Sequence, residues 1–299
     1  MILYICEVIF LMNYILVLTA DVLLALGFVL QKIYQKHDGS SNVSGLFFTM
    51  CVGFFSAVIF FVISGFNISI TPFSALTALL QTIFVTLYTL LSFKVLKSGD
   101  FALYMLFLMT GGMVLPYIFG VLFLNEELTL LRSIGLILII IAVILSNTGI
   151  KKPSKLNIIL CILIFCLNGG TSIVSKLHQV ESVFKTIDSE SFVFLTSAFK
   201  CLLSIPIFLV LKKKSNKNYK PNLKKVLPII AVSSLFSGIS YMLQLIGAAT
   251  LPATVVYPLI TGGSIILSSV VGLLVLKEKP SREQIAGTVI CFIGTGLFL

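Results

Sequence analysis

Runs of about 20 apolar residues follow one another along the whole chain, and each is long enough to cross a hydrocarbon layer about 30 Å thick. There are ten such runs, at residues 12–34, 44–65, 73–93, 100–124, 128–147, 156–176, 190–211, 226–247, 252–276 and 283–299. Lipid offers the backbone no hydrogen-bond partners, and the runs lack the alternating polar and apolar positions of barrel strands. Each run therefore predicts a helix, and the fold class is an all-α polytopic membrane protein with ten transmembrane helices.

The composition supports a membrane location. Hydrophobic residues make up 58% of the 299 residues, charged residues make up 11%, and the mean hydropathy is +1.11. A soluble domain of this length could not hide so much apolar surface in one core. The N-terminal MILYICEVIF has no basic residue ahead of its apolar part, so we expect no removable signal peptide, and Met12 is an alternative start.

Basic residues gather in alternate loops, those that follow helices 1, 3, 5, 7 and 9. They are Lys32 and Lys36, then Lys94 and Lys97, then Lys151, Lys152 and Lys155, then the seven lysines of residues 212–225, and finally Lys277, Lys279 and Arg282. The opposite side holds only Arg132, Lys176 and Lys185. The positive-inside rule predicts that the lysine-rich loops face the cytoplasm of a plasma-membrane protein, with both termini outside. The run KKKSNKNYKPNLKK at 212–225 could also recognise nucleic acid or anionic lipid, but such loops usually set orientation, so no nucleic-acid partner is expected.

The two halves of the chain, 1–150 and 151–299, repeat one another. The segment MTGGMVLPYIFGVLFLNEELTLLRSIG (109–135) corresponds to ITGGSIILSSVVGLLVLKEKPSREQIAG (260–287), with one residue inserted. Upstream, FFT at 47–49 aligns with FLT at 194–196, and Gly27 and Lys32 align with Thr171 and Lys176. Five helices is an odd number, so the second half must enter the membrane from the opposite side, and inverted repeats are typical of transporters. We expect a monomer, because duplication within one chain removes the need for a dimer.

The motif at the turn into the last helix of each half, LNEELTLLRSIG and LKEKPSREQIAG, resembles that of the EamA-type, ten-helix branch of the drug/metabolite transporter superfamily. The resemblance covers nearly the whole chain. It implies an inverted-repeat carrier with a central cavity that moves small metabolites or drugs, outward in many members. We interpret Glu126 and Glu278 of the motif as first-turn carboxylates, favoured by the helix dipole at the starts of helices 5 and 10.

Asp21 is the only acidic residue deep inside a predicted helix. An aspartate at the bilayer centre costs about 2.5 to 3.5 kcal/mol on insertion scales, and such residues mark ion or substrate pathways. One interpretation is a structural polar contact with a neighbouring helix. The other is a coupling site that binds either a proton or a cationic group. The resemblance favours the second, because the related small multidrug-resistance proteins use a membrane-embedded carboxylate in their first helix for proton exchange.

Lys200, in FLTSAFKCLLSIP (194–206), is the only basic residue at comparable depth. In one interpretation Asp21 and Lys200 pair with each other, which offsets the cost of burying each charge. In the other, both face a cavity and hold opposite ends of a zwitterion such as an amino acid. The sequence gives no distance between the two helices, so both interpretations stay open.

Glycine and proline fall at corresponding places in helices 4 and 9: Gly111, Gly112 and Pro116 against Pro258, Gly262 and Gly263. Such residues loosen the backbone beside a transport site, or they simply permit close packing. Polar side chains lie nearby, at Tyr104, Thr110, Tyr117, Tyr257 and Thr261. Tyrosine rings can hold an organic cation and their hydroxyls can bond a polar substrate. Asn168 and Gln244, with Tyr88 and Tyr241, are weaker candidates, because hydrogen bonds between helices explain them equally well.

Other classes of protein fit the sequence less well. The cysteines lack CxxC spacing and the two histidines, His37 and His178, lie in or near predicted loops, so we expect no metal site and no cofactor. A membrane-embedded enzyme would need a catalytic constellation around the deep acid, and a channel or scaffold would not need an inverted duplication. We therefore predict a transporter and not an enzyme: a carrier, in the lipid bilayer, of an amino-acid-like, zwitterionic or cationic small molecule. It would work by alternating access, with protons coupled through Asp21.

Overall fold

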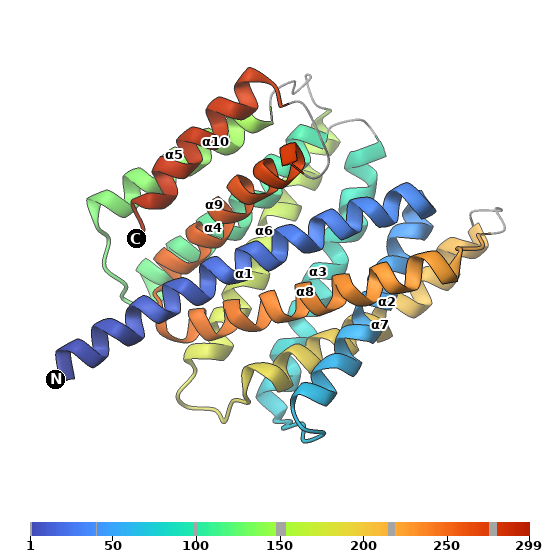
Figure 1. The fold of residues 1–299 in the computed structure, drawn as a ribbon, viewed down its shortest axis with the longest axis horizontal. Coiled ribbons are helices and arrows are strands. Elements are labelled where there is room, and N and C mark those ends of the chain that lie inside the picture. Colours follow the sequence, from blue (N-terminus) through green and yellow to red (C-terminus); the bar gives the residue numbers. More distant parts are fainter. Residues whose placement is uncertain (1, 40, 98–100, 148–153, 215–218, 275–279) are drawn as a thin grey trace.

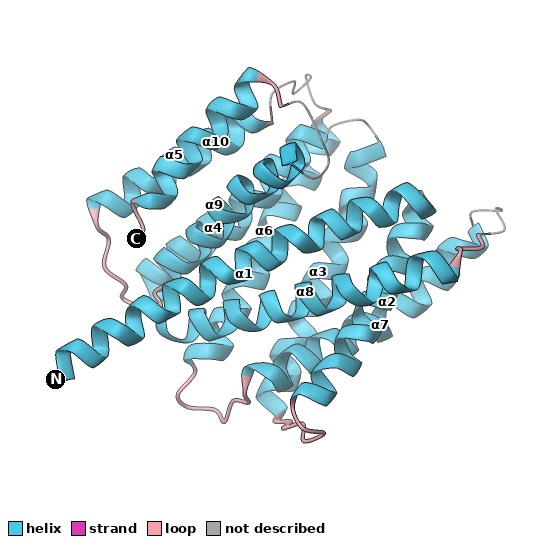
Figure 2. Ribbon diagram, in the orientation of Figure 1, coloured by secondary structure: helices cyan, strands magenta, loops and turns pink. Residues whose placement is uncertain are grey.

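The structure is a computed structural model that describes residues 2–39, 41–97, 101–147, 154–214, 219–274 and 280–299. These residues form ten α-helices and no strand, which confirms the all-α prediction (Figures 1 and 2). The helices are α1 (Ile2–Asp38), α2 (Asn42–Ile63), α3 (Pro72–Lys97), α4 (Phe101–Phe123), α5 (Leu130–Ser146), α6 (Lys155–Val180), α7 (Ser189–Lys214), α8 (Leu223–Thr250), α9 (Ala253–Leu274) and α10 (Arg282–Gly296).

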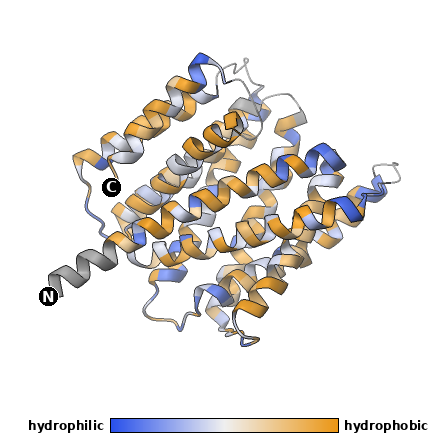
Figure 3. Cartoon of the chain, viewed as in Figure 1, coloured by the Kyte–Doolittle hydropathy of each residue, from blue (hydrophilic) through white to orange (hydrophobic). Residues whose placement is uncertain are grey.

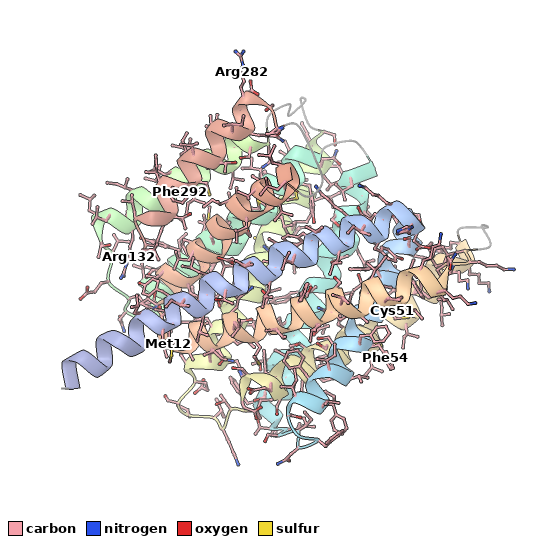
Figure 4. All side chains as sticks on the ribbon, in the orientation of Figure 1. Met12, Cys51, Phe54, Arg132, Arg282 and Phe292 are labelled. Carbon is pink, nitrogen blue, oxygen red and sulfur yellow. The ribbon has the colours of Figure 1, made fainter. Side chains whose placement is uncertain are left out.

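The helix bounds lie close to those predicted, with α1 as the main exception. The sequence predicts a start at residue 12, but α1 begins at Ile2 and its first turns project beyond the bundle (Figure 1). Within the described residues, eight helices are long and apolar enough to span a membrane, whereas α5 has 17 residues and α10 has 15. Apolar side chains cover the outside between more polar ends (Figure 3), and Phe54 and Phe292 point outward (Figure 4). The chain is a multi-pass membrane protein.

Helix contacts between the halves follow a regular rule. Helix α1 packs on α8 and α9, while α6 packs on α3 and α4. Helix α2 pairs with α7, α4 with α9 and α5 with α10. Shifting every label by five exchanges these pairs with one another. The packing is therefore what two related five-helix units would produce.

The α5–α10 pair shows how counterpart helices run relative to each other. A Cβ atom on Gly135, near the start of α5, would lie 2.8 Å from the carbonyl oxygen of Gly294, near the end of α10. A Cβ atom on Gly287, near the start of α10, would lie 2.9 Å from the carbonyl oxygen of Ala142, near the end of α5. The two helices are thus antiparallel, as Figure 1 shows. Antiparallel counterparts are what inverted repeats require.

The two ends of the bundle differ in charge. The end of α1, the end of α3 and the start of α8 carry Lys36, Lys94 and Lys224, and we call this the lysine-rich end. The opposite end holds the α8–α9 turn, the α4–α5 loop and the α6–α7 loop, and we call it the Glu126 end. Five lysines of the predicted cytoplasmic loops lie outside the described residues: Lys151, Lys152, Lys217, Lys277 and Lys279.

We expect Gly111→Ala to destabilise the bundle, because a Cβ atom at this position of α4 would collide with the backbone of Phe165 in α6. Overpacking of this kind typically costs about 1 to 3 kcal/mol. Gly296→Ala is the matched control, since a Cβ atom there has no neighbour within 4 Å. Thermal melting of the purified variants in detergent should show a lower midpoint for Gly111→Ala alone. Equal midpoints would mean that α4 and α6 do not approach this closely.

Candidate functional site

Asp21 lies near the middle of α1, at the contact of this helix with α9. Its side chain is fully buried, and a Cβ atom added to Gly263 would collide with its carboxylate. Within the described residues, neither carboxylate oxygen has a hydrogen-bond partner. On the α8 side, Ser240 Oγ donates to the carbonyl of Ala20 at 2.7 Å, and Gln244 Nε2 donates to Ser240 Oγ at 3.1 Å. The structure thus brings Asp21 and Gly263 together, and it links Gln244 to α1 through Ser240.

The same geometry recurs in the other half, between α6 and α4. A Cβ atom on Gly112 would lie 2.7 Å from Asn168 Nδ2, and this amide donates to the carbonyl of Leu108 at 2.7 Å. Since Gly112 and Gly263 are matched positions, Asn168 is the counterpart of Asp21. The sequence alignment of Gly27 with Thr171 is therefore three residues out of register. A shift of three residues is nearly one helical turn, so the apolar pattern alone could not detect it.

Lys200 does not pair with Asp21 in this structure. Its helix, α7, packs on α2 and α3, and the Asp21 carboxylate has no bonding partner among the described residues. The side chain of Lys200 is half-buried in α7. Of the two interpretations of this charge pair, the direct ion pair is therefore not formed here.

Helices α4 and α9 run without interruption through the glycine and proline positions that the sequence singles out. Pro116 has no N–H to donate to the carbonyl of Gly112, four residues earlier. Ser172 Oγ of α6 takes its place, at 3.2 Å from that carbonyl oxygen. Tyr257 of α9 in turn donates its hydroxyl to the carbonyl of Ser172 at 2.6 Å. At Pro116, the carbonyl that loses its helical donor is therefore satisfied by α6.

The other predicted residues near these positions have separate surroundings. Thr110 donates to the carbonyl of Leu106 in its own helix at 2.6 Å. The hydroxyl of Tyr117 lies 3.4 Å from Ser133 Oγ of α5. The remaining four are Thr261, half-buried in α9; Pro258, buried in α9; Gly111, against the Phe165 backbone; and Gly262, against Thr295 of α10.

The α8–α9 turn is held by two oppositely charged side chains. Lys176 of α6 is buried, and its ammonium donates to the carbonyls of Ala248 and Leu251, both at 2.7 Å. The Glu126 carboxylate accepts from the backbone N–H groups of Ala253 at 2.6 Å and Thr254 at 2.7 Å. A cation thus meets the end of α8 and an anion meets the start of α9, as the helix dipoles favour.

This arrangement corrects the interpretation of Glu126 as a first-turn carboxylate of helix 5. The N-cap of α5 is Thr129, whose side chain accepts from the Arg132 N–H at 3.3 Å. Glu126 precedes that cap and bonds a different helix, α9. Glu278, the matched acid of the second half, lies outside the described residues, while Ser281 forms a capping box with Gln284 at the start of α10.

Also at the Glu126 end, His178 lies in the last turn of α6, next to the α6–α7 loop, and is almost fully buried. Its Nε2 lies 2.8 Å from Ser74 Oγ of α3. Its ring stacks on Phe192 of α7 with 3.9 Å between centroids, and on Phe73 of α3 at 6.2 Å. Three helices are therefore packed tightly around this side chain.

The lysine-rich end instead contains a pocket of about 490 Å³. Polar and aromatic side chains of α1, α2, α3 and α4 line it, with each helix contributing residues of one face: Gln31, Tyr34 and Gln35; Asn42, Gly45, Phe48 and Thr49; Thr89, Ser92, Phe93 and Leu96; and Tyr104. Gly39 and Ser41 complete the lining. Its volume falls in the range of about 300 to 1,000 Å³ that is usual for small-molecule sites.

Of the predicted site residues, only Tyr104 lines this pocket. The sequence does contain a pattern for the other lining residues, because positions 42, 45 and 49 and positions 89, 92, 93 and 96 are spaced as one face of a helix. Near a helix end, hydroxyl and amide side chains at helical spacing look the same in the sequence whether they line a pocket or lie at the membrane surface. Their pattern therefore did not identify them as pocket residues.

Comparison with known proteins gives the class of this chain. The EamA-like transporter family matches residues 155–299, which contain α6 to α10. This match confirms the resemblance: the second half is an EamA-type domain, and the EamA family is part of the drug/metabolite transporter superfamily. The match of the second half indicates a membrane transporter of the drug/metabolite type.

Among curated proteins no match is found. Among solved structures, a protein described as "Crystal structure of protein" has 14% sequence identity, with 95% of this chain and 97% of that chain covered and a TM-score of 0.72. At this identity the likeness concerns the fold alone.

We expect Glu126→Gln to lower stability, because the two N–H groups at the start of α9 lose a charged acceptor. Hydrogen bonds to charged groups contribute about 1.5 to 3 kcal/mol each, and the neutral amide retains one acceptor oxygen. Glu127→Gln is the control, since Glu127 is the adjacent exposed acid. The thermal midpoint in detergent should fall for Glu126→Gln and stay unchanged for Glu127→Gln. A fall of equal size in both variants would contradict the role of Glu126 at the α8–α9 turn.

Proposed function

We propose that the protein is a secondary active carrier that moves a small organic molecule across the plasma membrane by alternating access. The observation that carries this proposal is the difference between the two ends of the bundle. The Glu126 end is closed by packed and hydrogen-bonded side chains, while the lysine-rich end holds a lined pocket. A carrier in a conformation open to one side of the membrane has one closed and one open end, whereas an open channel has a path open at both ends.

The corrected register explains the asymmetry residue by residue. When the two halves are aligned so that Asp21 matches Asn168, Gln31 matches His178 and Gly45 matches Phe192. His178 and Phe192 stack on each other and fill the Glu126 end. Gln31 and Gly45 occupy the equivalent places at the lysine-rich end and line the pocket. One half therefore closes its end with an aromatic stack, and the other half leaves the matching volume open.

We propose that the lysine-rich end faces the cytoplasm and that this conformation is open inward. The positive-inside rule supports this orientation. In the opposite conformation the two five-helix units, 1–150 and 151–299, would rock so that the pocket closes and the Glu126 end opens. The bonds from Glu126 of the first unit to the start of α9 in the second unit would have to break in that step.

Asp21 is our candidate for the coupling site. An unpaired carboxylate in an apolar interior is strongly disfavoured, so we propose that Asp21 carries a proton in this conformation. Its neutral counterpart Asn168 occupies the same place against Gly112. Helix α1 connects the two sites, because it carries Asp21 at its centre and Gln31 at the pocket. Movement of α1 away from α9 would expose the carboxyl group and allow the proton to leave.

The decisive test uses sealed proteoliposomes that contain a pH-sensitive dye. Amino acids, polyamines, quaternary ammonium compounds and nucleosides are added one at a time to wild type and to Asp21→Asn. We expect one class of solute to move protons with the wild type. The Asp21→Asn variant should fold normally, because an amide fits the equivalent place in the other half, and it should exchange solute without moving protons.

Glu127→Gln serves as the control for loss of an acidic side chain, and it should move protons as the wild type does. Solute transport without proton movement in the wild type would refute coupling through Asp21. Transport of no class of solute would refute the carrier itself.

A further inference from the structure

We infer that the pocket at the lysine-rich end binds an uncharged solute with a planar ring and hydrogen-bonding edges, of the nucleoside class. This inference rests on the proposed function, because it takes the pocket as the substrate site of the carrier. It replaces the zwitterionic or cationic substrate that the sequence suggested.

The lining carries no formal charge. Its polar groups are amides and hydroxyls, and among the described residues no aspartate, glutamate, lysine, arginine or histidine contributes to it. A charged solute that entered would leave water without meeting an opposite charge, which is strongly disfavoured. The two deep charges of the sequence, Asp21 and Lys200, do not line the pocket either.

Among the described residues, the acid adjacent to the pocket lining is Asp38, which already accepts hydrogen bonds from the protein itself. Asp38, at the end of α1, accepts through one carboxylate oxygen from the hydroxyls of Tyr34 at 2.5 Å, Ser44 at 2.7 Å and Tyr219. Tyr219 comes from the segment between α7 and α8, so these bonds join it to α1 and α2. Three donors on one oxygen make Asp38 a structural anchor beside the pocket. These bonds hold the carboxylate against the protein's own hydroxyl groups.

The hydrogen-bonding groups of the lining suit the edges of a heterocycle and a sugar. Thr49, Thr89 and Ser92 donate their hydroxyl protons to carbonyls of their own helices, at 2.9, 2.7 and 2.7 Å. The oxygens of Thr49 and Thr89 remain able to accept from a solute, while Ser92 also bonds the hydroxyl of Tyr104. Gln31 and Gln35 lie one turn apart on α1, and each amide can both donate and accept, as the edge of a nucleobase requires.

Aromatic rings supply the rest of the wall. Phe48 and Phe93 line the pocket from α2 and α3, and Tyr104 lines it from α4. Any planar base can stack on such rings, and the sugar of the nucleoside would then face the hydroxyl groups of the pocket. Gly45 leaves space between these walls, since a Cβ atom there would make only an ordinary contact of 3.9 Å with Phe93.

Calorimetric titration of the purified full-length protein in detergent tests the inference without transport. The probes are uridine, UMP, choline, glycine and glucose. We expect uridine to bind, and the other four to bind at least about 10-fold more weakly, because each lacks the ring or adds an uncompensated charge. Thr89→Val should weaken uridine binding about 3- to 10-fold, the usual effect of losing one hydrogen bond.

Two further variants make the test specific. Thr86→Val is the matched control, because Thr86 lies one turn earlier in α3, bonds the carbonyl of Thr82 at 2.8 Å and does not line the pocket. It should leave the uridine affinity unchanged. Gly45→Phe places in the pocket the ring that Phe192 provides in the other half, and it should abolish uridine binding while the thermal midpoint stays at or above that of the wild type.

Tighter binding of any charged probe or of glucose, or no binding of uridine at millimolar concentration, would overturn the inference. Equal effects of Thr89→Val and Thr86→Val, or uridine binding that survives Gly45→Phe, would overturn the assignment to this pocket. Binding of uridine with no uridine uptake into proteoliposomes would leave the inference intact and refute the proposed carrier instead.

Discussion

The need to satisfy every backbone hydrogen-bonding group inside a medium without water governs this structure. That need arises at helix ends and at carbonyls that lose their helical donor to a proline, such as the Gly112 carbonyl below Pro116. The chain meets it with side chains of other helices: Lys176 at the end of α8, Glu126 at the start of α9 and Ser172 at the Gly112 carbonyl. Two of these three belong to α6, which therefore connects α4, α8 and α9 near the Glu126 end.

This use of polar groups also explains the contrast between the halves. Helix α6 carries Asn168, Ser172 and Lys176 along its length, and each bonds the backbone of a neighbouring helix. Its counterpart α1 carries Asp21, whose oxygens have no partner among the described residues, and Gln31 at the pocket. The same fold thus gives one fixed helix and one helix with unsatisfied polar groups. The second is the better candidate for the helix that responds to proton and solute.

The sequence predicted the large features because they depend on patterns that span many residues. Apolar runs located all ten helices, and the repeated glycines and the LxE motif located the matching ends. It also selected Asp21 and Gly263 separately, without indicating that they touch. The register of helix 1 against helix 6, the continuity of α4 through Pro116 and the burial of His178 depend on single contacts. One-turn shifts leave the apolar pattern almost unchanged, so such details could not be derived from it. The pocket was not predicted either, because its side chains resemble those of any polar helix end.

The most direct test of the central claim measures which end of the bundle is open. The six native cysteines are replaced, and single cysteines are placed at Thr49, in the pocket, and at Ser175, which lies 3.0 Å from the Tyr241 hydroxyl toward the Glu126 end. A membrane-impermeant maleimide is then added to right-side-out and to inside-out vesicles. The account predicts that the cysteine at position 49 reacts from the cytoplasmic face alone and that the cysteine at position 175 is protected from both faces. Labelling of position 175 from outside, or of position 49 from outside, would contradict it.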